Sequence, residues 1–146
     1  MPVEATSITE ADIAGAVACI QQAFKDDPYN NWVFDQQAFS FSRNSVSLSM
    51  RCRWGMSHAL FKVARDSSDP SDKVLGVACW LAPRSPSEPQ SWSEWAGDWW
   101  LWSSQVRMNL WYGRGGLNVK RYYIWKVSRL FMCYRSSGLY LCVVCD

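Results

Sequence analysis

The sequence predicts an α+β or α/β fold, in which helices cover a mixed sheet. Runs of apolar, β-favouring residues alternate with segments whose apolar residues recur every three or four positions. Two of the strand-like runs, 59–66 and 74–83, follow each other across the polar turn SSDPSDK, as in an antiparallel hairpin. The predicted order is therefore β-α-α-β-β-helical insert-β, which is typical of a mixed layered fold rather than of a helical bundle.

The first half supplies one strand and two helices. Residues 2–8 predict a short strand, and Thr9 is a good N-cap for a helix that ends near Pro28. Residues 29–34, YNNWVF, are interpreted as a loop. A second helix is predicted over about 39–58, where apolar residues recur every four positions.

The second half is dominated by tryptophan. After a Pro/Ser linker, Ser91 and Glu94 have the spacing of a capping box and predict a helix that glycines 113, 115 and 116 end. A further helix is predicted from about 117 to 134, so that a Trp-rich helical insert covers about 91–134. The last strand, 139–145, has no polar alternation, which predicts burial on both faces in the middle of a sheet.

Length and composition predict a single domain over 1–146. Hydrophobic residues make up 49% of the 146 residues and charged residues 19%, which excludes a disordered chain. The net charge of +2 excludes no class of partner, but no acidic residue occurs between Asp98 and Asp146. The C-terminal third could therefore face an anion, or its charge could be a solvated face. Its basic residues are Arg107, Arg114, Lys120, Arg121, Lys126, Arg129 and Arg135.

Leader, membrane and metal signals are absent from the sequence. It has no signal peptide and no run of about 18 apolar residues, so we expect no transmembrane segment. The six cysteines lie in apolar contexts, which predicts reduced core residues in a cytoplasmic protein. Cys142 and Cys145 have C-x-x-C spacing, but positions i and i+3 of a strand point to opposite faces. We therefore predict no metal site.

The tryptophans of 91–112 lie at helical spacing and leave three interpretations open. Their face, Trp92, Trp95, Trp99 and Trp102, could pack on the sheet or line an acyl-acceptor groove, which is the most frequent use of such a face. It could instead lie on a membrane surface, or stack on sugars or bases. His58 is interpreted as a cap or packed residue, and Trp32, Trp54 and Trp80 as core residues.

The sequence resembles the N-terminal half of a GNAT-superfamily N-acetyltransferase of a fungal subgroup. The resemblance rests on TSITEADI and ACIQQAF, DDPYNNWVFD, SMRCRWGM, KVLGVACWLAP, SWSEWAGDWWLW, QVRMNLWYGRGGLNVKRYYIW and GLYLCVVC. It covers nearly the whole chain, but only about half of the family's domain. It implies acetyl-CoA as cofactor and a small-molecule or peptide amine as acceptor. We expect no nucleic-acid partner.

The resemblance also implies where the cofactor would bind. Backbone groups near the end of the fourth strand hold the pantetheine arm in the family, which places this role at Val144 and Cys145. The phosphate loop Q/R-x-x-G-x-G/A that follows in the family is absent, and residues 113–116 do not replace it. No catalytic residue is assigned; Glu94 and Asp98 are acidic and near the insert, and are interpreted as cap and surface residues.

We therefore expect a truncated and inactive form of such an enzyme, which binds acetyl-CoA weakly or not at all. Residues 127–137, VSRLFMCYRSS, do not fit a polar helix end, and we interpret them as a retained intron or a misassigned reading frame. The alternative hypothesis is a non-enzymatic binding module. Its Trp-rich, basic helical segment would bind a membrane surface or a protein partner.

Overall fold

Four strands form one antiparallel sheet in the order β1, β2, β3, β4. The computed structural model describes residues 3–68, 73–81 and 89–125, and the backbone of 140–144. The strands are β1 (Val3–Ser7), β2 (Leu60–Asp66), β3 (Val74–Trp80) and β4 (Tyr140–Val144). The helices are the 3₁₀ turn η1 (Glu10–Asp12), α1 (Ile13–Ala23), α2 (Pro28–Val33), α3 (Phe41–His58) and α4 (Trp92–Tyr112). The α+β class is confirmed, and the predicted order of elements is confirmed except for α2, a helix that the prediction lacked.

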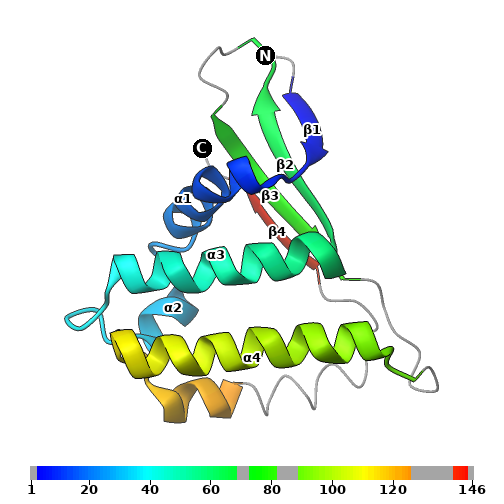
Figure 1. The fold of residues 1–146 in the computed structure, drawn as a ribbon. Helices are drawn as coiled ribbons and strands as arrows, with labels where there is room; N and C mark the ends of the chain where they lie inside the picture. Colours follow the sequence, from blue (N-terminus) through cyan, green and yellow to red (C-terminus); the bar gives the residue numbers. More distant parts are fainter. Residues whose placement is uncertain (1–2, 69–72, 82–88, 126–139, 145–146) are drawn as a thin grey trace.

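The core lies between the sheet and two helices, α1 and α3. Val63 of β2 pairs with Val77 of β3, and both side chains are buried against apolar residues of α1 and α3. Figure 1 shows a third layer: α4 runs antiparallel to α3, and α3 is its main contact. Helix α3 is therefore buried on two sides. Cys52 and Gly55 belong to the side that faces the sheet, whereas Arg43 and Ser47 face α4.

The start of the first helix is fixed by a buried carboxylate. The Asp12 carboxylate accepts hydrogen bonds of 2.7 Å from both the N–H and the hydroxyl of Thr9, which confirms the predicted cap. Its other oxygen is paired with the Arg65 guanidinium of β2. Because both side chains are largely buried, this pair ties the beginning of α1 to the sheet.

Residues 28–33 form helix α2, so the predicted loop at 29–34 is wrong. The Asp27 side chain accepts a 2.9 Å hydrogen bond from the N–H of Asn30, and Pro28 occupies the first helical turn. An Asp N-cap followed by Pro is a strong start signal, and here it outweighs the aromatic and asparagine content of the segment. The helix ends at Phe34, which forms an isolated antiparallel bridge with Leu117.

The chain after α4 returns to α2. Helix α4 ends at Gly113, whose φ of 70° lies in the left-handed region that glycine adopts without strain. Residues 119–125 are helical, and the remainder of the predicted helix to 134 lies outside the described residues. The Arg121 guanidinium donates a 2.7 Å hydrogen bond to the Trp32 carbonyl and lies 5.8 Å from the centre of its ring. Trp32 is 40% exposed, so its predicted place in the core is wrong.

Strand β4 is the outermost strand of the described sheet, not a central one as predicted. It pairs with β3 along one edge, in the register Trp80↔Tyr140 to Gly76↔Val144. The apolar run alone does not distinguish a central strand from an edge strand. Cys19 is disulfide-bonded, so the expectation that every cysteine is reduced is wrong for that residue. Cys52 and Cys79 are free thiols.

Candidate functional site

The most unusual surface of the described chain is a row of exposed tryptophans on α4. We call Trp92, Trp95, Trp99 and Trp102 the α4 aromatic face. Their exposed fractions are 83%, 46%, 50% and 59%. Neighbouring rings meet edge-on or tilted, with centroids 5.7, 5.7 and 5.2 Å apart. With about half or more of each side chain exposed, the face is not a core face, so the interpretation that it packs on the sheet is wrong. Whether it lines an acyl-acceptor groove or a membrane surface stays open.

A different stripe of α4 faces α3. Ser104 and Met108 are buried, and Gly97 approaches the imidazole of His58 so closely that a Cβ would clash with it. Residues 97, 104 and 108 lie on one side of a helix because their spacings are close to multiples of 3.6. Because this side of α4 faces α3, the indoles lie on other sides of the helix.

Polar contacts complete the α3–α4 interface. The Ser47 hydroxyl donates a 2.9 Å hydrogen bond to Gln105 Oε1. Arg43 is 6% exposed; its Nε donates a 2.8 Å hydrogen bond to the Gly113 carbonyl, and its Nη2 bonds to the Asn109 side chain. These bonds fix the rotation of α4 about its axis. The exposure of the α4 aromatic face is therefore a consequence of a specific interface.

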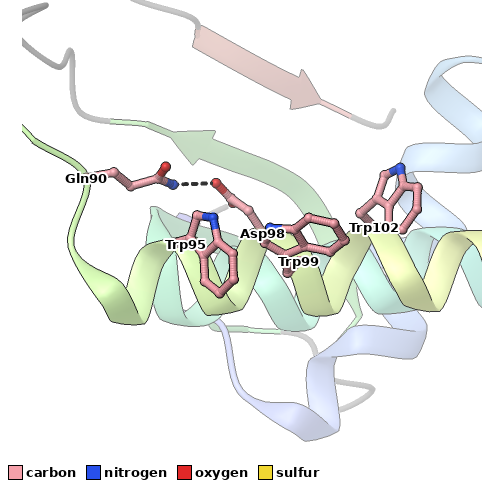
Figure 2. A pocket seen from close by; sticks show the side chains of 5 residues that line it. All are labelled: Gln90, Trp95, Asp98, Trp99 and Trp102. Atoms are coloured by element: carbon pink, nitrogen blue, oxygen red, sulfur yellow. Dashed lines mark hydrogen bonds between the residues drawn. The ribbon is translucent and has the colours of Figure 1, made fainter.

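A hollow of ≈ 290 Å³ lies on the α4 aromatic face. Figure 2 shows three indoles along it, with a carboxylate among them. The Gln90 side-chain amide, from the residues before α4, donates a 2.7 Å hydrogen bond to Asp98 Oδ2. The lining residues are Gln90, Trp95, Asp98, Trp99 and Trp102. Indole faces carry negative electrostatic potential, so the indoles and the carboxylate favour a positively charged group.

Glu94 caps the beginning of α4. Its carboxylate accepts 2.9 Å hydrogen bonds from the N–H and the hydroxyl of Ser91, and the Glu94 N–H bonds to the Ser91 hydroxyl at 3.3 Å. This is the predicted capping box. Asp98 is a surface residue, as expected, but it also lines the hollow.

His58 is packed, as the sequence analysis expected. Its ring stacks on Trp54 with an interplanar angle of 4° and a centroid distance of 4.9 Å. Its Nδ1 lies 2.8 Å from the Trp54 carbonyl oxygen, within hydrogen-bond distance. Trp54 and Trp80 are half-buried. With one ring face on Trp54 and Gly97 beside the ring edge, His58 is a spacer between α3 and α4.

The two residues expected to hold pantetheine lie at the end of β4. Val144 pairs with Gly76 of β3 at the end of the described sheet opposite to Trp80. Alternate backbone groups of a strand point to its two sides, so part of the β4 backbone faces away from β3. Cys145 lies outside the described residues. The structure therefore places Val144 on the outer strand of the described sheet.

Gln90 and the hollow were not found from the sequence. The signal that could have found the hollow is the combination of Asp98 with Trp95 and Trp102, because positions i−3 and i+4 are neighbours of a residue on a helix surface. In the described part of the chain, no group of three or more His, Cys, Asp and Glu could hold a metal ion. No helix there is both long and apolar enough to cross a membrane.

Comparisons with known proteins give one structural likeness. No family model matches the sequence, and no curated protein sequence is similar to it. Among solved structures, the chain is similar to one described as histone acetyltransferase HPA2 and related acetyltransferase, from Corynebacterium glutamicum. The two are 21% identical, with a TM-score of 0.41, over 62% of this chain and 55% of that chain. The chain thus matches about half the length of that protein. A likeness of this extent does not identify the family of the present chain.

Proposed function

We propose that this chain forms the first four strands of an acetyl-CoA-dependent N-acetyltransferase of the GNAT type, similar to its fungal members. The observation that carries the proposal is the connectivity. The two long helices α1 and α3 lie between β1 and β2 in the chain, and β2, β3 and β4 follow as consecutive antiparallel neighbours. This is the arrangement that the resemblance of the sequence implies. The edge of β4 that faces away from β3 is then the place of the cofactor.

The reaction would be direct attack of an amine on the thioester carbonyl of acetyl-CoA. The new C–N bond forms, the C–S bond breaks, and the amine proton goes to solvent or to the leaving thiolate. Catalysis of this kind requires that the amine be held near the carbonyl and that the carbonyl be polarised. Backbone groups near Val144 and Cys145 would supply the contacts to the pantetheine arm. The acceptor is a small-molecule or peptide amine.

We further propose that this chain alone is inactive and binds acetyl-CoA weakly, in the cytoplasm. The support is a sequence pattern: the 146 residues contain no Q/R-x-x-G-x-G/A phosphate loop. Gly115 and Gly116 follow α4 and pack against Arg43 and against the Asp35–Ala38 turn, so they are committed to structure. Without such a loop, the backbone N–H groups that hold the pyrophosphate in the family are not supplied by this pattern.

Calorimetry with acetyl-CoA and with acetyl-pantetheine tests the proposal. Since only the pantetheine arm has contacts here, the two ligands should bind equally weakly, with millimolar dissociation constants. ADP, which carries the phosphates without the arm, should not compete. Micromolar binding of acetyl-CoA, or binding that ADP abolishes, would contradict it.

A second candidate function is favoured by the exposure of the α4 aromatic face. Tryptophan suits the interface of a bilayer, and basic residues such as Arg107 and Arg114 follow on the exposed surface. In this case the chain is a non-enzymatic module that binds a membrane surface. Co-sedimentation with phosphatidylcholine vesicles, with and without phosphatidylserine, tests it. Pelleting that Trp92→Ala reduces supports the module, and a fully soluble chain at every vesicle concentration excludes it.

A further inference from the structure

We propose that the hollow on α4 is a binding site for a small alkylammonium cation, such as a methylated amine. It is separate from the proposed acyl-transfer position. Its volume of ≈ 290 Å³ is at the lower end of the range for small-molecule pockets, which limits the ligand to a head group with a short arm. The inference does not depend on acetyl transfer or on membrane binding.

The walls of the hollow are suited to a cation with an apolar shell. Trp95, Trp99 and Trp102 present three indoles, and their rings already contact one another at 5.7 and 5.2 Å. About half of each side chain is exposed, at 46%, 50% and 59%. The mutual contacts limit the rotation of the rings, so little ordering is needed when a ligand enters. Methyl groups around a positive nitrogen can contact all three indoles.

The charge of the hollow is negative. Asp98 and Glu94 are the only charged residues of α4 before Arg107. Gln90 donates its hydrogen bond to Oδ2 of Asp98, and Oδ1 accepts no hydrogen bond from any residue that the structure describes. The amide of Gln90 is neutral, so it holds the carboxylate in place without cancelling its charge. A cation is the ligand that uses both the indole faces and the remaining oxygen.

The position of the hollow separates it from the end of β4. Gly97, one residue before Asp98, lies against His58 at the end of α3, and β2 begins two residues later at Leu60. Leu60 pairs with Trp80, whereas Val144 pairs with Gly76, which precedes Trp80 by four residues in β3. At 3.3 Å per residue these pairs are about 13 Å apart. The ammonium site therefore lies towards the other end of the sheet.

A pair of isosteres tests charge against shape. Choline and 3,3-dimethyl-1-butanol differ in one atom, nitrogen or carbon, and hence in charge. Each is titrated into the intact chain, labelled with ¹⁵N, and the indole N–H resonances are followed. We expect choline to shift the signals of Trp95, Trp99 and Trp102 in a saturable way, and the neutral alcohol to shift them much less. Equal shifts by both ligands, or none with millimolar choline, overturn the proposal.

Two neighbouring tryptophans provide a matched control. Trp99 and Trp100 are each 50% exposed, but only Trp99 lines the hollow. Trp99→Leu should weaken choline binding about 2- to 5-fold, the value of one exposed cation–π contact, and Trp100→Leu should leave it unchanged. Asp98→Asn should weaken it about 5-fold. Equal effects of Trp99→Leu and Trp100→Leu would show that the cation binds the exposed indoles nonspecifically, and would overturn the proposal.

Discussion

Gly97 of α4 lies directly against the imidazole of His58, the last residue of α3. The ring cannot move aside easily, because it stacks on Trp54 and its Nδ1 lies within hydrogen-bond distance of the Trp54 carbonyl oxygen. This contact sets how closely the two long helices approach. It thereby decides which side of α4 faces solvent.

Gly97→Ala should destabilise the chain. Alanine favours a helix over glycine by about 1 kcal/mol, but the clash with His58 should cost about 1–3 kcal/mol. In a His58→Ala background the clash is absent, and the same substitution should stabilise by about 1 kcal/mol. Urea unfolding of the four proteins gives the coupling between the two positions. An identical effect in both backgrounds would contradict the contact.

Arg43→Lys should lower the free energy of unfolding by about 2–4 kcal/mol. Lysine keeps the charge but cannot bond both the Gly113 carbonyl and the Asn109 side chain with one rigid fork, so a buried cation loses hydrogen-bond partners. Arg51→Lys is the control on the same helix, because Arg51 is exposed. Chemical denaturation measures both. If the two substitutions have equal effects, Arg43 does not hold α4 in place.

The stability of the chain should fall below pH 3.8 because of Asp12. Burial raises the pKa of this carboxyl, but the Thr9 hydroxyl and N–H and the Arg65 charge together outweigh burial and leave the pKa below its ordinary value of 3.8. A lowered pKa means that the stabilisation is complete above pH 3.8 and is lost as the pH falls through the folded-state value. Asp12→Asn should remove this dependence and cost about 3 kcal/mol at neutral pH.

Glu10→Gln is the matched control for Asp12. Glu10 and Arg53 form an ion pair of 2.6 Å, but their side chains are 61% and 48% exposed. An exposed pair contributes about 0–1 kcal/mol, so this variant should keep the acid-dependent loss of the parent chain. If Glu10→Gln and Asp12→Asn change the acid unfolding profile equally, the buried pair is not the group that titrates.

Cys52 should be nearly inert to alkylation in the folded chain. Burial, with the neighbouring Cys79 thiol, raises the pKa of Cys52 to about 11 from an ordinary value of 9.0. At pH ~8 its thiolate fraction, and with it the rate, is then roughly 100-fold lower. Mass spectrometry after iodoacetamide treatment, with a guanidinium-unfolded control, measures the rate. Fast labelling of the native chain would show that the Cys52 thiol is accessible to solvent, which would contradict its burial.

The sequence predicted the elements well where local signals were strong. The Ser91–Glu94 capping box and the end of α3 at His58 follow from local sequence signals, and the β2–β3 hairpin follows from two apolar runs across a polar turn. Helix α2 was missed because the cap of Asp27 and Pro28 was given less weight than the composition of YNNWVF. In each of these cases the residues that start or connect the element were visible in the sequence.

The burial of α4 could not be predicted from hydrophobicity. The tryptophans form the most apolar arc of the helix, but Gly97, Ser104 and Met108 face α3 because helix approach depends on side-chain size as well as polarity. The hollow depends on that rotation and on Gln90, which reaches Asp98 from outside the helix. Contacts of this kind arise only when the elements are assembled.

The most direct test of the central claim is the position at which acetyl-pantetheine contacts the chain. In ¹⁵N-labelled protein, millimolar acetyl-pantetheine should shift the backbone amides of Val143 and Val144 and leave those of β1, at the far edge of the sheet, unchanged. Acetyl-CoA should produce the same shifts at the same concentrations. Shifts confined to other elements, or no shifts in β4, would contradict the claim that this strand is the beginning of an acetyl-CoA site.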